Sequence, residues 1–199
     1  MTQRIVANLG CGPHDSGSLP GYFADWRQLR VDADNSVAPD IVADLTDLSA
    51  LDDESVDAIW ASHCVEHLFL HQVPQALHEF HRVLADHGFA VILVPDLQTV
   101  ASYFSNDRPH EAIYQSGAGP ISAHDMFYGH GDAIARGRTF MAHRCGFTPA
   151  LLQVLVRETP FVEAIIRRRP QRLELVTVLR KTAPASAVER DALLQALGL

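Results

Sequence analysis

The chain has 199 residues, of which 47% are hydrophobic and 20% charged, and its formal net charge at pH 7 is −8. This length and composition predict a single globular domain over residues 1–199. The acidic balance argues against binding to duplex nucleic acid, whose phosphates normally meet a basic face.

Three cysteines without paired spacing argue against a disulfide framework or a cysteine-rich zinc module; they are Cys11, Cys64 and Cys145. The sequence shows no apolar leader and no run of about 18 apolar residues, as a membrane span would need. We therefore expect a cytoplasmic protein that does not cross a membrane. The oligomeric state is left open.

The first predicted strand, residues 5–9, is followed by Gly10 and Gly12. A continuous apolar run is typical of a strand buried on both faces of a parallel sheet, and the glycines let the chain turn and bring bare backbone to a ligand. In open α/β sheets the ligand crevice lies at the carboxyl ends of the strands. A dinucleotide fingerprint is disfavoured, because Pro13 and His14 follow instead of a third glycine and a long helix.

A second predicted strand, residues 28–31, ends in an acidic turn that contains Asp32 and Asp34. Asp32 follows Gly12 at about the distance at which an acid in such folds accepts hydrogen bonds from ribose hydroxyls. The alternative is a capped turn, since aspartate and asparagine favour turns by themselves. Asp34 competes with Asp32 for the ribose role.

Three further apolar runs, residues 40–43, 56–61 and 88–94, predict the third to fifth strands. Between the last two, apolar residues at helical spacing predict a helix that starts near Pro74 and stops at Gly88. The alternation of strands and helix predicts a parallel α/β sheet.

The pattern then changes to a polar, histidine-rich stretch, residues 97–147, which we predict to be a lid-like insertion after the fifth strand. A helix follows from Thr148–Pro149 to about residue 158. Residues 162–167 and 173–179 predict a hairpin, and residues 183–199 predict a tail that contains a terminal helix.

Four segments of the first half resemble a known family in order and spacing, together with the helix and strand that run to Val94: Asn8–Pro13, Val31–Asp34, Ala43–Leu45 and Asp57–Leu68. The chain is similar to the class I S-adenosylmethionine-dependent methyltransferases, in particular the small bacterial type 11 branch. The resemblance implies a Rossmann-like α/β fold with a seven-stranded, mostly parallel sheet, the last strand antiparallel and helices on both faces. It also implies the cofactor S-adenosyl-L-methionine and an enzyme of class EC 2.1.1.-.

The resemblance assigns ten positions to the cofactor: Asn8, Gly10, Cys11, Gly12, Asp32, Ala33, Asp44, Leu45, Ser62 and His63. In the family the two glycines pass under the cofactor and the acid at position 32 holds the ribose. Asp44 and Leu45 correspond to the adenine side, and Ser62 and His63 to the methionine side. The sequence departs from many members at Asn8, where an acid is common, and at His14, where a third glycine is common.

A sulfonium methyl donor is already activated, so the protein has mainly to orient the acceptor and exclude water. A base is needed only where the acceptor carries a proton, and we predict His124 and His143 as catalytic candidates. The predicted acceptor site comprises His67, Asp96, His124, Asp125, Tyr128 and His143. The alternative for each histidine is that it pins the insertion by hydrogen bonds.

We therefore predict methyl transfer to a small-molecule acceptor, which is the expected partner. The alternative is a non-catalytic module that binds the cofactor as a sensor or as a subunit of a complex. Production of S-adenosylhomocysteine with some acceptor separates the two.

A competing pattern runs from His63 to His67, with Glu66 between, and matches the H-x-x-E-H motif of zinc peptidases. We expect no metal, because the match directly follows a predicted buried strand and lacks a clear third ligand. For Glu66 and His67 the alternatives are helix capping and packing, or catalysis.

Two other groups of residues have open interpretations. Four arginines of the hairpin, Arg167, Arg168, Arg169 and Arg172, indicate a solvated turn or, alternatively, a site for an anionic acceptor or an RNA backbone. Cys11 and Cys64 follow neighbouring strands, and ordinary packing is favoured over a redox switch.

Overall fold

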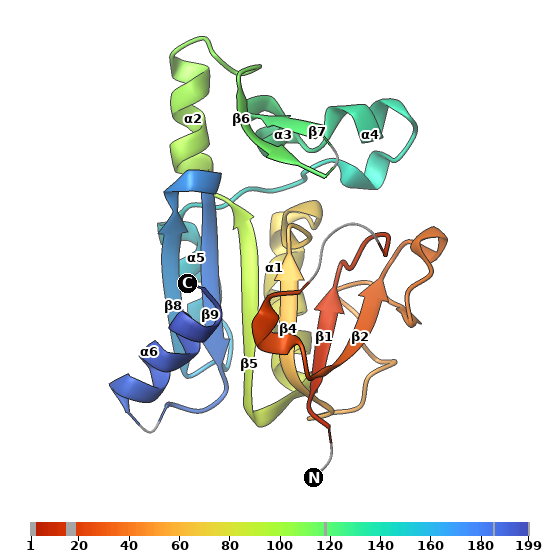
Figure 1. Ribbon diagram of the computed structural model, residues 1–199, viewed down its shortest axis with the longest axis vertical. Coiled ribbons are helices and arrows are strands. Elements are labelled where there is room, and N and C mark those ends of the chain that lie inside the picture. Colours follow the sequence, from red (N-terminus) through yellow and green to blue (C-terminus); the bar gives the residue numbers. More distant parts are fainter. Residues whose placement is uncertain (1–2, 15–18, 118, 185, 199) are drawn as a thin grey trace.

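A seven-stranded sheet with the order β3-β2-β1-β4-β5-β9-β8 forms the centre of the computed structural model, which describes all residues except 1–2, 15–18, 118, 185 and 199 (Figure 1). Its strands are β1 (Ile5–Leu9), β2 (Arg27–Asp32), β3 (Ile41–Val42), β4 (Val56–Ser62), β5 (Leu84–Pro95), β8 (Glu163–Arg169) and β9 (Glu174–Arg180). Strands β3, β2, β1, β4 and β5 pair in parallel, whereas β9 is antiparallel to both β5 and β8. The predicted Rossmann-like fold with an antiparallel last strand is confirmed.

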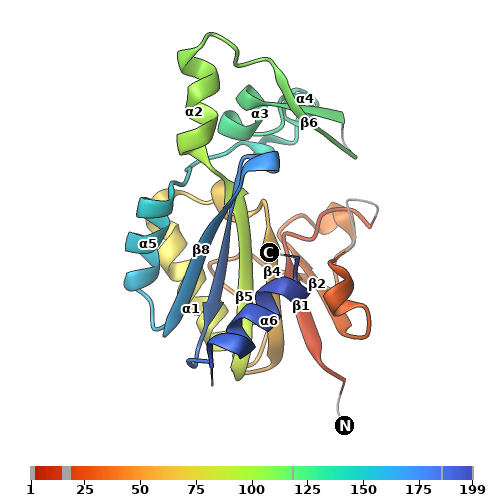
Figure 2. The same ribbon diagram turned by 60° about the vertical axis from the view of Figure 1, so that its left-hand side comes forward.

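Helices cover both faces of this sheet (Figures 1 and 2). Helices α1 (Val73–Val83) and α5 (Pro149–Arg157) lie on one face, where Phe80 and Leu155 join the larger apolar core. The other face carries α6 (Ala187–Ala196) and a short 3₁₀ helix (Gly21–Phe23), which contribute Leu194 and Phe23 to a second core. Burial of apolar side chains on both faces explains why the sheet strands read as continuous apolar runs.

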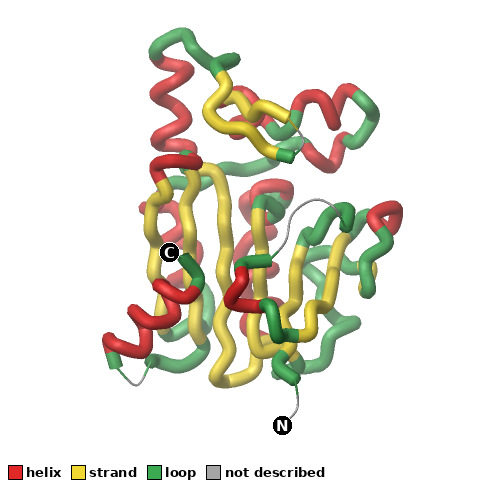
Figure 3. Tube along the Cα trace, viewed as in Figure 1, coloured by secondary structure: helices red, strands yellow, loops and turns green. Residues whose placement is uncertain are grey.

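The insertion after β5 is a small ordered unit and not a plain loop (Figure 3). It consists of α2 (Leu97–Ser105), the hairpin β6 (Ala112–Ser116) and β7 (Gly119–Ser122), and the short helices α3 (Ala123–Tyr128) and α4 (Gly131–Ala135). Val100, Ala123 and Met126 form its own apolar cluster. The insertion lies beyond the carboxyl ends of β4 and β5, at the top of Figure 1.

Short 3₁₀ helices occupy several connections: Asn35–Val37, Val65–His67, Leu70–Gln72, Thr139–Met141 and Pro170–Arg172. The segment Val65–His67 follows directly on the end of β4, and Pro170–Arg172 forms the turn between β8 and β9.

One predicted boundary is wrong. The helix that was expected to stop at Gly88 ends at Val83, and Leu84 already belongs to β5. Leu84 pairs with Val56 of β4, and the register shifts before Ala58 pairs with Phe89. Strand pairing across this irregularity therefore overrides the helical spacing of residues 84–87.

Candidate functional site

The glycine turn after β1 lies against the end of β4. Gly10 and Gly12 both have positive φ angles, of 62° and 60°. A Cβ atom at Gly10 would lie 2.4 Å from the Cβ of Cys64, so this position accepts no side chain. Gly10 is thus required both by its backbone conformation and by its close packing against Cys64.

Asp32, at the end of β2, is tied to this turn. One carboxylate oxygen accepts a hydrogen bond from the Gly12 N–H at 2.9 Å, and the other accepts from the Asp34 N–H at 2.9 Å. Each carboxylate oxygen can accept a second bond, so the group keeps capacity for hydroxyl donors of a ligand. The Asp34 side chain has a different role. Its carboxylate accepts a hydrogen bond from the Ser36 N–H and caps the 3₁₀ helix Asn35–Val37.

Arg30 organises the same corner, and the sequence analysis did not single it out. This buried side chain donates to the carbonyl oxygens of Gly12 at 2.5 Å and Ala38 at 2.8 Å, and it contacts His14 Nε2 at 2.6 Å. It joins the glycine turn to the loop after β2. A basic residue between the apolar residues Leu29 and Val31 of β2 was the available signal.

The predicted adenine side lies next to this corner. A surface hollow of about 370 Å³ is lined by Ala33, Val42, Ala43, Asp44, Asp47, Ser49 and Ala50. One Asp44 oxygen accepts from the N–H and hydroxyl of Thr46, while Leu45 is buried. Ala33 and Asp44, which come from loops after different strands, are therefore brought together as the resemblance implies.

These features fit an adenosyl sulfonium cofactor. A side-chain-free turn allows close approach, the Asp32 carboxylate suits ribose hydroxyls, and the nearby acids suit a cationic ligand. Asn8 lies in β1, and Cys11 is buried with its N–H donated to the Val31 carbonyl.

An ionic network of the half-buried His63 and two buried glutamates lies at the end of β4. His63, which follows Ser62, places Nδ1 3.3 Å from Glu66 Oε1 and Nε2 3.0 Å from Glu174 Oε2. Both glutamates are almost fully buried, and Arg169 Nη1 lies 2.9 Å from the second oxygen of Glu174. Both ring nitrogens of His63 thus have carboxylate partners, and its main-chain N–H donates to the Leu93 carbonyl.

The charges of this network support one another. Burial opposes a charge on His63, but the hydrogen bonds that its ring donates to Glu174 and Glu66 outweigh this effect and raise the pKa of His63 to about 10. Burial alone would raise the pKa of Glu66, yet the contact with His63 brings that pKa below its ordinary value. At neutral pH the network therefore contains an imidazolium between two carboxylates.

The insertion meets the sheet domain at Glu66. The main-chain oxygen of Glu66 accepts from the N–H groups of Arg144 at 2.9 Å and Cys145 at 3.2 Å. His67 Nδ1 lies 3.1 Å from the Ala142 carbonyl oxygen, and His143 Nδ1 lies 3.1 Å from that of Met126. The two rings are 5.0 Å apart between centroids.

His143 also faces the network, because its Nε2 lies 3.9 Å from Glu66 Oε1. Burial lowers the pKa of His143, although Glu66 acts in the opposite direction. A neutral imidazole thus faces an ionised carboxylate at the boundary between the insertion and the sheet.

The other predicted acceptor residues have different surroundings. His124 stacks with His110 at 5.5 Å and lies 4.9 Å from the exposed Tyr128. The Asp125 carboxylate accepts hydrogen bonds from Ser122 and Gly131 and so caps α3. These contacts suit a structural role for Asp125, whose proposed contact with an acceptor stays a prediction.

Asp96 is buried after β5 and accepts from the Thr99 hydroxyl at 2.7 Å, with Arg168 Nε at 3.3 Å. Arg168 and Arg169 therefore pair with buried acids at the top of the sheet, while their side chains stay partly exposed to solvent as the hairpin interpretation expected. Glu174 was missed by the sequence analysis, although an acid at the start of an apolar strand was a usable signal.

Tyr114 of β6 was missed as well. Burial raises the pKa of Tyr114, and Glu174, Arg172 and Glu66 all act on it electrostatically. The Arg172 guanidinium lies 5.9 Å from its ring centre. Tyr114 therefore lies within electrostatic reach of the network, from the side of the insertion.

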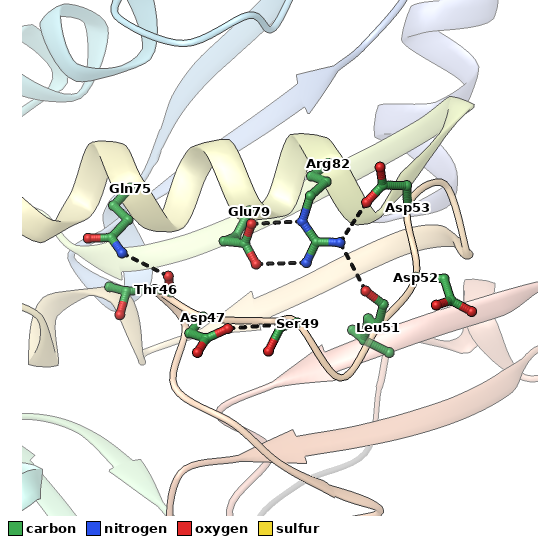
Figure 4. A pocket seen from close by; sticks show the side chains of 9 residues that line it. All are labelled: Thr46, Asp47, Ser49, Leu51, Asp52, Asp53, Gln75, Glu79 and Arg82. Carbon is green, nitrogen blue, oxygen red and sulfur yellow. Dashed lines mark hydrogen bonds and ion pairs between the residues drawn. The ribbon is translucent and has the colours of Figure 1, made fainter.

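A larger hollow, of about 630 Å³, lies beside α1 and away from the glycine turn (Figure 4). Arg82 crosses it and contacts Glu79, Asp53 and the Leu51 carbonyl, each at 2.7–2.9 Å. Arg82 thereby fastens the loop before β4 to α1. Because the residues that line this hollow hold the loop in place, we interpret it as structural and not as a ligand site.

The zinc-peptidase pattern does not have the geometry it needs. Residues 65–67 form a 3₁₀ turn, so His63 and His67 do not share one face of an α-helix, and His63 is held by two glutamates. Within the described part of the chain, no three His, Cys, Asp or Glu side chains are arranged to hold a metal ion. A search of the same residues finds no helix with the length and apolar character of a membrane span.

Comparison with known proteins gives a family match in the first half of the chain. Residues 21–92 match a family model described as a methyltransferase domain. No curated protein matches the chain.

Solved structures of low sequence identity share the fold. A methyltransferase of Methanosarcina mazei, described as SAM-dependent, is 12% identical with a TM-score of 0.58, over 91% of this chain and 94% of that one. A SAM-dependent methyltransferase of Archaeoglobus fulgidus is 14% identical, with a TM-score of 0.54 and coverage of 90% and 86%. The 1,6-didemethyltoxoflavin-N1-methyltransferase of Burkholderia thailandensis, solved with that compound and S-adenosylhomocysteine, is 18% identical, with a TM-score of 0.52 and coverage of 91% and 72%.

Proposed function

We propose that the chain is a class I S-adenosylmethionine-dependent methyltransferase and that it methylates a small molecule bound between the insertion and the carboxyl ends of β4 and β5. The methyltransferase-domain match over residues 21–92 and the shared fold support this proposal. One observation carries this proposal. The insertion brings His143 to within 3.9 Å of Glu66, at the end of the strand that also carries the predicted cofactor residues Ser62 and His63.

The cofactor S-adenosylmethionine supplies an activated methyl group when it is bound. In the proposed arrangement the backbone of Gly10 and Gly12 lies under it, Asp32 accepts from its ribose hydroxyls, and Asp44 and Leu45 lie at its adenine. The ionic network at His63 gives the methionine side a rigid border, since its ring contacts a carboxylate at both nitrogen atoms.

The insertion then supplies the acceptor side. Its ordered core and its hydrogen bonds to Glu66 hold His143 and His67 in fixed positions, and a covered site keeps water from the reacting atoms. His143 is the catalytic histidine that this geometry favours, because it is buried and its pKa is lowered by that burial. His124, the other predicted candidate, stacks on His110 and Tyr128 in the insertion.

The experiment is to incubate the purified chain with S-adenosylmethionine and the small-molecule fraction of an extract from its source cells. We expect S-adenosylhomocysteine to form only when the fraction is present. Tight cofactor binding without any turnover would instead support the non-catalytic binding module, and turnover only with the macromolecular fraction would contradict a small-molecule acceptor.

A further inference from the structure

The two edges of the central sheet differ in how well they are protected from pairing with another strand. At one edge, β3 consists of two residues only, Ile41 and Val42. At the other edge, β8 has seven residues without a proline, and within the described chain it pairs only with β9, without a shift in register (Figure 1). Edge strands are normally kept short or interrupted, because their free N–H and C=O groups can pair with another chain. Strand β8 therefore presents a long free edge.

Charged side chains on an edge strand commonly discourage pairing, but two of the three arginines in β8 are directed elsewhere. Arg168 Nε lies 3.3 Å from Asp96 Oδ2, and Arg169 Nη1 lies 2.9 Å from Glu174 Oε1. Both guanidinium groups thus reach back towards the neighbouring strands β5 and β9. Arg167 is different, because its side chain is exposed and no described residue pairs with its guanidinium group.

Glu163, at the start of β8, also lacks a close partner. Its Oε1 lies 3.7 Å from Arg190 Nη1 of α6, beyond hydrogen-bond distance, and its Oε2 accepts no hydrogen bond from a described residue. Alternate residues of a strand share one face, so Glu163, Ile165 and Arg167 all lie on the face that α6 covers, where Ile165 packs against the second core. The free edge thus carries an acid and a base at equal distances on either side of Ile165.

We propose that β8 is a dimerisation edge, at which it pairs antiparallel with β8 of a second copy of this chain about a two-fold axis through Ile165. In this register Glu163 of each copy lies opposite Arg167 of the other, and Ile165 lies opposite its own counterpart. Directly opposite residues are close enough for the two charges to pair. The dimer also covers Val162, whose side chain is 65% exposed beside the start of β8. The two seven-stranded sheets thereby become one continuous sheet.

The order of charges along β8 favours a second copy in this orientation and register. A parallel copy would place Glu163 beside Glu163 and Arg167 beside Arg167, and like charges opposite each other destabilise a strand pair. Moving the axis to Ile166 would place Glu163 opposite Arg169, whose guanidinium group is already paired with Glu174. Antiparallel pairing of the strand with itself is therefore the arrangement that joins the two least satisfied charges of this edge.

The first experiment exchanges the two charges. Sedimentation equilibrium of the purified chain should show a monomer–dimer equilibrium, and Arg167→Glu should weaken dimerisation by about tenfold or more, because each dimer then contains two like-charge pairs. Glu163→Arg should weaken it similarly, whereas the double variant Glu163→Arg/Arg167→Glu should return to within about threefold of the wild type. Arg27→Glu, which makes the same change at an exposed position of β2, is the matched control and should dimerise as the wild type does.

The results that would overturn the proposal are distinct from one another. A wild type that stays monomeric at its highest soluble concentration would show that the edge does not pair, and association beyond a dimer is incompatible with a closed two-fold contact. A dimer that neither single variant weakens would use another surface. Single variants that weaken the dimer without recovery in the double variant would overturn the pairing of Glu163 with Arg167.

A second experiment tests the register with single cysteines. Under mild oxidation Ile165→Cys should form a disulfide-linked dimer, because the two copies of residue 165 face each other at the axis. Ile166→Cys should crosslink far less, since its counterpart lies diagonally across the strand pair. The wild type, which keeps Cys11, Cys64 and Cys145, gives the background. Crosslinking at residue 166 without crosslinking at residue 165 would overturn the register, and no crosslinking above background at either position would overturn the pairing of β8 with itself.

Discussion

His63 Nε2 lies 3.0 Å from Glu174 Oε2, although the two residues are 111 positions apart in the chain. The contact joins the end of β4 to the start of β9, across β5. This ion pair therefore links the parallel strand β4 to the antiparallel strand β9, which lie on either side of β5. Because Glu66 contacts the same ring, this one imidazole also connects the sheet to the boundary with the insertion.

This relationship predicts a pH-dependent stability. The folded pKa of His63, about 10, lies above the ordinary value of 6.5. Its charge therefore stabilises the folded state fully below about pH 6.5, and this contribution is lost as the pH rises through about 10. Denaturant unfolding of wild type and His63→Gln should show a stability difference that shrinks over this window.

The control for this measurement is His87→Gln. His87 also contacts a carboxylate, Asp57 at 2.8 Å, but its side chain is 74% exposed, so little change is expected. A difference between wild type and His63→Gln that stays constant from pH 6 to pH 10 would show that the His63 charge is not held by the glutamates.

A second prediction concerns the glycine turn. Gly10→Ala should lower the free energy of unfolding by more than about 2 kcal/mol, because it combines the cost of a positive φ with a Cβ placed 2.4 Å from Cys64 Cβ. Gly137→Ala is the matched control, since Gly137 has φ of 92° but no atom within 4 Å of its added Cβ. It should cost about 1–2 kcal/mol. Equal losses in chemical denaturation would mean that Gly10 is not packed against β4.

A third prediction separates the two histidines of the insertion. His143→Ala should lower acceptor turnover by about 10²-fold or more while cofactor affinity stays within about threefold, as expected for loss of a general base. His124→Ala should have a smaller effect, because its ring contacts His110 and Tyr128 and no contact with Glu66 is seen in the described structure. Steady-state kinetics and calorimetry on both variants measure this. Loss of cofactor binding together with turnover in His143→Ala would contradict the acceptor role.

The sheet could be predicted from the sequence because its signals are local. Apolar runs, a glycine turn and an acid at the end of the second strand each lie within a few residues. The insertion was harder to predict, since its glycines and polar residues indicate a loop, whereas Met126 and Val100 pack together and Asp125 caps α3. Such order depends on contacts between segments and not on the pattern within one.

The ionic network also depends on contacts between distant segments, which local sequence patterns do not reveal. Glu66 and His67 were recognised in the sequence, but Glu174 reaches His63, and brings Arg169 with it, only through the antiparallel entry of β9 beside β5. Likewise, spacing alone does not show that His143 faces Glu66 while His124 stacks with His110. The two histidines have different neighbours because their side chains point in different directions within the insertion.

The most direct test of the account is calorimetric titration of S-adenosylmethionine into the wild type, Asp32→Ala and Asp34→Ala. Asp32 receives the Gly12 N–H and is the expected ribose ligand, whereas Asp34 caps a 3₁₀ helix. We expect the wild type to bind, Asp32→Ala to lose about 1.5–3 kcal/mol of binding free energy, and Asp34→Ala to bind nearly as the wild type does. No binding heat for the wild type, or equal affinity in Asp32→Ala, would contradict the cofactor site described for this chain.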